Sequence, residues 1–147
     1  MSSQATASTT QENQARQGRE RVLIVDDERG VRALCTDLLR RAGYDTEAVD
    51  SPTAALRRLD EARFDVIVMD INMPVMNGVE LCRRIRARHS EQPVVLITGC
   101  PSIETAVRGI REGASEYLVK PFTPDQLREV VGRALTQRPP ARAALPL

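Results

Sequence analysis

Short apolar runs alternate with amphipathic stretches between Arg21 and about Gln137. Four of the runs are almost wholly aliphatic and end at polar residues, which is typical of parallel strands buried on both faces. They occupy residues 22–25, 66–69, 94–97 and 117–119. A fifth segment, 44–49, mixes polar and apolar side chains as an edge strand does. The pattern therefore predicts five strands, one of them at an edge.

The segments between and after these strands carry apolar residues at the spacing of a buried helical stripe. In the first segment the stripe consists of Val31, Leu34, Cys35, Leu38 and Leu39. In the fourth it consists of Ile103, Val107, Ile110 and Ala114, and in the fifth of Leu127, Val130, Val131, Ala134 and Leu135. Capping signals mark the boundaries as well. Gly43 can end the first helix, and the residues that can cap the later four are Ser51, Asn77, Ser102 and Thr123.

Five strand and helix segments in alternation predict βα units joined by right-handed crossovers. The expected fold class is α/β, with a parallel five-stranded sheet between two layers of helices. At 147 residues, the chain is long enough for one such domain with its own core and too short for two. We expect this domain to span residues 20–137.

The two ends of the chain differ from this central part. Residues 1–19 are rich in Ser, Thr and Gln and lack the apolar core of a signal peptide or membrane anchor. Residues 138–147 are interrupted by prolines. Both segments are predicted to be disordered tails, because they offer little apolar surface to offset the entropy of ordering. No run approaches the roughly 18 apolar residues of a membrane span, so no membrane partner is expected.

Charge and cysteine content narrow the function further. The 21 basic and 20 acidic residues leave a net charge of +1, so direct binding of nucleic acid has no electrostatic support. The three cysteines, Cys35, Cys82 and Cys100, form no CxxC or Cys/His cluster. Reduced thiols and a cytoplasmic location are therefore expected.

Polar residues follow four of the predicted strands at the point where each ends. Because the carboxyl ends of parallel strands meet at one edge of a sheet, their side chains should share a crevice. The residues concerned are Asp26 and Asp27 after the first strand, Asp70 after the third, Thr98 after the fourth and Lys120 after the fifth.

These residue types suit magnesium-dependent phosphoryl chemistry. Three carboxylates in one crevice repel each other, and a hard divalent cation with oxygen ligands relieves the repulsion. The backbone carbonyl of Asn72 could add a further oxygen ligand. A carboxylate can also attack phosphorus to form an aspartyl phosphate. Lys120 could then pair with the phosphoryl oxygens, and Thr98 could donate a hydrogen bond to one of them.

Four stretches around these residues form a recognisable set. They read VLIVDDE at 22–28, VIVMDINMPVMNG at 66–78, VVLITG at 94–99 and YLVKPF at 117–122. In this combination the chain resembles bacterial response regulator receiver domains over about residues 20–137. The stretch TGCPSIETAV at 98–107 is most similar to receivers of the nitrogen-regulator class.

The resemblance implies a flavodoxin-like sheet with strand order 2-1-3-4-5. It makes Asp70 the phosphoacceptor and Mg²⁺ the cofactor. The metal ligands that it implies are Asp26, Asp27, Asp70 and the backbone carbonyl of Asn72.

The resemblance also implies a signalling cycle rather than turnover of a separate substrate. A sensor histidine kinase, a phosphotransfer protein or a small phosphodonor would supply the phosphoryl group. The domain would not be an enzyme beyond assisting this transfer and the later hydrolysis. Thr98 and Tyr117 would form the switch pair, and the Lys120–Pro121 peptide bond would be cis. The face built from the fourth helix, fifth strand and fifth helix would signal to a partner, an output domain or a second copy of the chain.

Three other functions share part of this pattern. Haloacid-dehalogenase-like phosphatases also use an aspartate at a strand end, but need an acid two residues later to protonate the leaving group, and Asn72 cannot do this. A flavodoxin-like FMN carrier needs a phosphate loop after the first strand, where Asp26, Asp27 and Glu28 would repel phosphate. A pseudo-receiver would keep the fold without being phosphorylated, and a phosphorylation assay separates it from a true receiver.

Overall fold

A computed structural model describes residues 19–137 and contains one parallel sheet in this range. The strands follow the order β2-β1-β3-β4-β5, which confirms both the predicted fold class and the expected topology. Their bounds are β1 (Arg21–Val25), β2 (Asp45–Val49), β3 (Val66–Asp70), β4 (Val94–Thr98) and β5 (Glu116–Val119). The tails predicted at the two ends lie outside the described residues, apart from Arg19.

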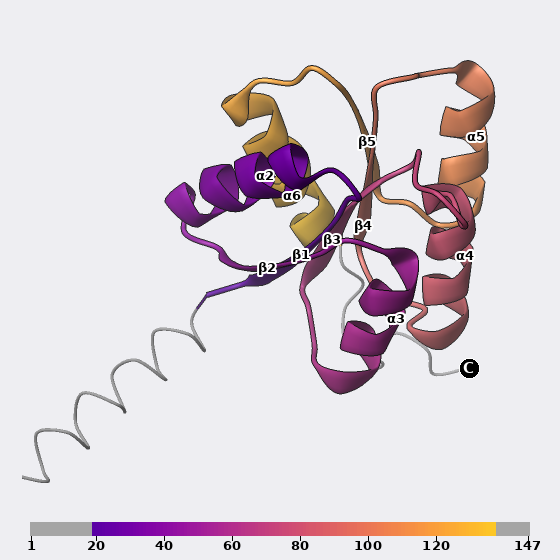
Figure 1. The fold of residues 1–147 in the computed structure, drawn as a ribbon, viewed down its shortest axis with the longest axis horizontal. Coiled ribbons are helices and arrows are strands. Elements are labelled where there is room, and N and C mark those ends of the chain that lie inside the picture. The colour runs from indigo at the N-terminus through magenta and orange to yellow at the C-terminus, as the bar shows by residue number, and fades with distance from the viewer. Residues whose placement is uncertain (1–18, 138–147) are drawn as a thin grey trace, which may run out of the picture.

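Five helices cover the two faces of this sheet (Figure 1). They are α2 (Arg29–Arg41), α3 (Pro52–Glu61), α4 (Gly78–Arg88), α5 (Ile103–Arg111) and α6 (Pro124–Thr136). Helices α2 and α6 lie on one face, and α3, α4 and α5 lie on the other (Figure 1). This is the three-layer arrangement that right-handed βα crossovers produce.

Each face of the sheet has its own apolar core, because successive residues of a strand point to opposite faces. On the α2 and α6 side, Val22 and Ile24 pack with Cys35 and Leu39. On the opposite side, Leu23 packs in a cluster that includes residues of α3 and α4. The two central strands β3 and β4 are buried along their whole length. Burial on both faces explains why their sequences are continuous aliphatic runs.

The helix starts agree with the capping signals in the sequence. Ser51, Asn77 and Ser102 each accept a hydrogen bond from the backbone N–H three residues later, at 2.9 to 3.1 Å. Thr123 forms a reciprocal capping box with Gln126. These caps satisfy N–H groups that a helix leaves without partners at its first turn.

The apolar stripe predicted to be buried on the fourth helix faces solvent instead. Ile103, Val107 and Ile110 are 86%, 43% and 55% exposed, and α5 packs against the sheet through Gly109. Of that predicted stripe, Ala114 is buried, and it lies after the helix ends. The apolar residues do lie on one side of α5, as their spacing predicts. Spacing alone does not determine whether the sheet covers that side. In α2 the prediction holds more closely, although Leu34 is 49% exposed.

Strand register brings the predicted site residues to one edge of the sheet. Val25 of β1 lies opposite Met69 of β3, so Asp26 and Asp70 follow at the same level. Asp70 lies opposite Ile97 of β4, and Thr98 lies opposite Val119 of β5. The register therefore places all four strand ends beside one another.

Gly78 closes the loop between β3 and α4 behind this edge. A Cβ atom at this position would lie 2.6 Å from the backbone oxygen of Asp70 and 2.8 Å from the Cα atom of Ile71. We expect Gly78→Ala to lower the free energy of unfolding by about 1–3 kcal/mol, since backbone atoms must move to admit the methyl group. Urea unfolding monitored by circular dichroism measures the change.

Gly132 in α6 provides a matched control. A Cβ atom there meets no other atom within 4 Å. Gly132→Ala should therefore raise the free energy of unfolding by about 0.5–1 kcal/mol through its higher helix propensity. Equal effects of the two substitutions would contradict the close approach at Gly78.

Candidate functional site

Three aspartates converge at the carboxyl edge of the sheet. Asp26 and Asp70 are each 3% exposed, whereas Asp27 is exposed. One carboxylate oxygen from each residue can be chosen so that all three lie within 4.8 Å of one another. The sequence prediction that β1 and β3 deliver these side chains to a shared site is therefore consistent with the geometry.

Lys120 reaches the same site from the end of β5. Its Nζ atom lies 3.5 Å from Oδ2 of Asp26 and 3.6 Å from Oδ1 of Asp70. Lys120 is the only lysine in the chain, in which the other 20 basic residues are arginines. A single ammonium group thus lies between two buried carboxylates.

Burial and neighbouring charges shift the pKa values of Asp26, Asp70 and Lys120. Burial raises the pKa of Asp26, and the hydrogen bond from the backbone N–H of Glu28 at 2.8 Å opposes this shift. Burial also raises the pKa of Asp70, and the neighbouring Asp26 adds to this effect. Burial alone would lower the pKa of Lys120, but the two aspartates outweigh it and raise that pKa. The negative charges are therefore only partly compensated by Lys120.

The aspartate cluster has the composition of a site for a hard divalent cation. Oδ1 of Asp70 is buried and has no hydrogen-bond partner. Such an oxygen retains lone pairs for a metal ion or for phosphorus. Three carboxylate oxygens at this spacing fit the oxygen ligands that Mg²⁺ prefers. The part predicted for the carbonyl of Asn72 stays a prediction.

Thr98 links the site to the loops that follow β3 and β4. Its side chain is buried, and its Oγ1 atom accepts hydrogen bonds from Nδ2 of Asn72 and from the backbone N–H of Cys100, both at 3.0 Å. The hydroxyl of Tyr117 lies 3.3 Å from Oγ1 of Thr105, in the first turn of α5. The proposed switch residues therefore contact different partners in this structure. The Lys120–Pro121 bond is cis, as expected.

Two contacts around the site had no signal in the sequence. Nη1 of Arg32 donates a hydrogen bond of 2.8 Å to the backbone oxygen of Asp26. Thr105 is the hydroxyl partner of Tyr117. Both contacts join residues of different elements through side chains, so neither hydrophobic spacing nor a motif could indicate them.

The sequence and fold were compared with known proteins. Residues 22–132 match the response regulator receiver domain family. This chain belongs to that family. As a receiver it is a signalling domain of the kind found in two-component systems, whose general function is to be phosphorylated by a kinase.

Individual relatives agree with this assignment. The receiver is 42% identical over 120 residues to the response regulator protein FleR of Pseudomonas aeruginosa. The matched region covers 81% of this chain and 25% of FleR. It is similar to the chemotaxis protein CheY4 of Vibrio cholerae, with a TM-score of 0.77, 37% identity, and coverage of 80% of this chain and 100% of CheY4. It is also similar to the beryllofluoride-activated NtrC4 receiver domain dimer, with a TM-score of 0.77, 33% identity, and coverage of 81% and 98%.

These relatives include receivers of the nitrogen-regulator type, as the sequence predicted. The chain spans a quarter of the length of FleR and of the Escherichia coli regulatory protein AtoC. Within residues 19–137, no helix has the length and apolar composition needed to cross a membrane.

The raised pKa values make stability depend on pH when metal is absent. The folded receiver binds protons on Asp26 and Asp70 more tightly than the unfolded chain does. Its stability therefore falls as the pH rises from the ordinary aspartate pKa of 3.8 through the raised values. Asp70→Asn removes one of these charges. It should raise the free energy of unfolding at neutral pH, by about 1 kcal/mol.

Urea unfolding in EDTA buffer, at neutral pH and near the ordinary aspartate pKa, measures this effect. The gain should shrink at the lower pH, where the carboxyl group is protonated in the folded state and half protonated in the unfolded chain. Asp27→Asn is the control and should change stability less, because Asp27 is exposed. A loss of stability in Asp70→Asn at neutral pH would contradict the charge crowding.

Proposed function

We propose that this receiver accepts a phosphoryl group on Asp70 in a reaction that depends on Mg²⁺. The observation that carries the proposal is the buried Oδ1 atom of Asp70. This oxygen has no hydrogen-bond partner, and it lies 3.6 Å from Nζ of Lys120 and beside two further carboxylates. A nucleophile, a cation to receive the phosphoryl oxygens and a candidate metal site thus share one edge of the sheet.

A sensor histidine kinase, a phosphotransfer protein or a small phosphodonor is the proposed source of the phosphoryl group. The bond from phosphorus to the donor breaks as a bond to an Asp70 carboxylate oxygen forms, and the donor leaves with the electron pair. When bound by Asp26, Asp27, Asp70 and the carbonyl of Asn72, Mg²⁺ would neutralise negative charge that otherwise repels the donor. Lys120 compensates charge on the phosphoryl oxygens.

Phosphorylation then changes the hydrogen bonds of Thr98. Its hydroxyl now accepts bonds from Asn72 and Cys100, and a phosphoryl oxygen on Asp70 would compete for its proton. Movement of Thr98 would alter the neighbouring loop after β4, the start of α5 and the contact between Thr105 and Tyr117. This chain of contacts supports the two-residue switch.

The signal is read at the face formed by α5, β5 and α6. Support comes from the apolar side chains that this face exposes, since large exposed apolar patches mark interaction sites. They are Ile103, Val107 and Ile110 on α5, together with Val119 of β5, which is 40% exposed. A partner protein, an output domain or a second copy of the receiver could cover them. The dimeric NtrC4 receiver is a relative in which two copies associate.

Phosphorylation of Asp70 can be tested directly. Incubation with acetyl phosphate and Mg²⁺ should give a base-labile mass gain of one phosphoryl group, measured by intact-protein mass spectrometry. Asp70→Asn should abolish the gain while circular dichroism shows a folded chain. EDTA should also abolish it, because the three aspartates then repel the donor. A label on another residue, or equal labelling in EDTA, would refute the assignment.

Lys120→Ala should separate phosphorylation from switching. The chain has no tryptophan and two tyrosines, Tyr44 and Tyr117. In a Tyr44→Phe background, Tyr117 is therefore the only tyrosine that fluoresces. In that background acetyl phosphate and Mg²⁺ should change the emission of Tyr117. In Lys120→Ala the mass gain should persist at a lower rate. The emission should stay unchanged, because the ammonium group that would draw the end of β5 toward the phosphoryl group is missing.

Arg133→Gln is a control, since it removes a cation that pairs with Glu116 at the far end of β5. It should retain the emission change. An unaltered emission change in Lys120→Ala would show that Lys120 does not couple the site to Tyr117.

A further inference from the structure

A basic groove is lined by residues of helix α2 and of the edge strand β2, and none of the predicted site residues lines it. Its volume is about 470 Å³, within the range of small-ligand sites. It is lined by Arg29, Arg32, Ala33, Thr36, Asp37, Arg40 and Ala48. Three of the seven residues that line the groove are therefore arginines, and one, Asp37, is acidic.

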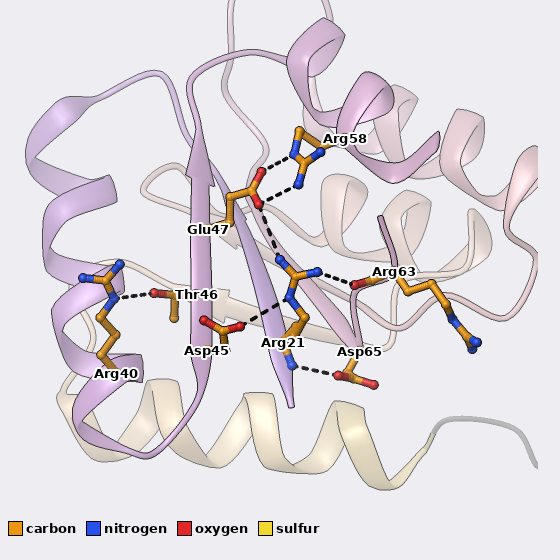
Figure 2. Close-up of polar contacts among 8 residues, drawn as sticks. All are labelled: Arg21, Arg40, Asp45, Thr46, Glu47, Arg58, Arg63 and Asp65. Atoms are coloured by element: carbon orange, nitrogen blue, oxygen red, sulfur yellow. Dashed lines mark hydrogen bonds and ion pairs between the residues drawn. The ribbon is translucent and has the colours of Figure 1, made fainter. Parts of the chain in front are cut away.

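None of these three arginines forms an ion pair with a carboxylate in residues 19–137. Three carboxylates of α2 and β2 are paired with other arginines. Asp37, which also lines the groove, pairs with Arg41 at 3.1 Å, and Asp45 of β2 pairs with Arg21 at 3.5 Å. Glu47 pairs with Arg58 on the other side of β2, as Figure 2 shows. The three arginines of the groove thus outnumber its one lining carboxylate, Asp37, which is already paired with Arg41.

Neutral acceptors hold two of the three guanidinium groups in place. Nη1 of Arg32 donates to the backbone oxygen of Asp26 at 2.8 Å. Nε of Arg40 donates to Oγ1 of Thr46 at 2.9 Å (Figure 2). These bonds restrict the side chains without neutralising them, and each guanidinium keeps further N–H donors. Donors held in position before binding lose less entropy when a ligand arrives.

We infer that this groove binds a small anion with several phosphate groups, either a free polyphosphate or the phosphate chain of a nucleotide. The planar guanidinium fork matches phosphate oxygens and binds them through paired hydrogen bonds. Arg29 and Arg40 are eleven positions apart on one helix, or about 16 Å along its axis. This separation favours an extended ligand over a single phosphate.

An acidic protein segment fits the groove less well. Stable protein interfaces usually bury at least about 1,200 Å² and are anchored by aromatic or large apolar side chains. The residues that line the groove include no aromatic and no large aliphatic side chain. The groove therefore offers charge and room for a small anion but no anchor for a protein.

Calorimetric titration of the full chain with sodium tripolyphosphate, in EDTA, tests the site. About 0.15 M NaCl in the buffer screens charges that lie further apart than about 8 Å. One ligand should bind per chain. The combined variant Arg29→Gln, Arg32→Gln and Arg40→Gln should bind tripolyphosphate at least about tenfold more weakly. A loss of this size corresponds to the loss of one charge-assisted hydrogen bond. Arg29→Gln alone should also weaken binding, and it removes no contact within the described chain.

A control variant removes the same charge from other surfaces. Arg57→Gln, Arg108→Gln and Arg111→Gln change three exposed arginines outside the groove and should keep the parent affinity. Asp70→Asn should keep it too, which separates the groove from the phosphoacceptor site. Equal weakening in the control variant, or unchanged binding in the groove variant with an intact circular dichroism spectrum, would overturn the inference.

Two further ligands identify the chemistry. ATP in EDTA binding more tightly than tripolyphosphate would assign a nucleotide, and equal affinity would assign the phosphate chain itself. An octaglutamate peptide that binds more tightly than both would overturn the phosphate assignment. Because this site does not depend on Asp70, its failure would leave the proposed phosphorylation untouched.

Discussion

Crowding of negative charge at one sheet edge is the constraint on which the rest of this structure depends. Parallel register forces the ends of β1 and β3 to the same level, so Asp26 and Asp70 are buried side by side. Their repulsion is only partly relieved by Lys120 at 3.5 and 3.6 Å. A buried carboxylate without full compensation costs free energy, and a cation or a covalent modification changes that cost. Under the proposed function, metal binding and phosphoryl transfer to Asp70 would both relieve this repulsion.

Helix α5, which follows Thr98 and the loop after β4, has little buried surface. Helix α5 has one buried residue, Gly109, and its large apolar side chains face solvent. Polar contacts hold it at both ends. Thr105 meets Tyr117 at its first turn, and Arg86 of α4 donates to the backbone oxygen of Gly113 just beyond its last turn. A helix with little buried apolar surface can shift at low cost in free energy, so small changes at Thr98 can alter an exposed face.

Local charge separation is hidden by the near-neutral composition of the chain. On one side of β2, the carboxylates Asp45 and Glu47 are paired with Arg21 and Arg58 (Figure 2). Arg21 also lies over the ring of Phe64, 4.8 Å from its centroid. On the other side, Arg32 and Arg40 of α2 donate hydrogen bonds to neutral oxygens. The net charge of +1 excludes a strongly basic protein, but it says nothing about where uncompensated charge gathers.

The sequence by itself determined the strands, the helix starts and the residues at the strand ends, because each depends on neighbours close in the chain. Aliphatic runs give β3 and β4, and Ser51 or Thr123 caps a helix through atoms three residues away. Only the tertiary structure decided that Ile103 and Ile110 face solvent, since spacing defines a face but not what covers it. It also decided which carboxylates neutralise which arginines. Long side chains reach across elements such as α2 and β2, and their pairing depends on distances in space that the order of residues does not contain.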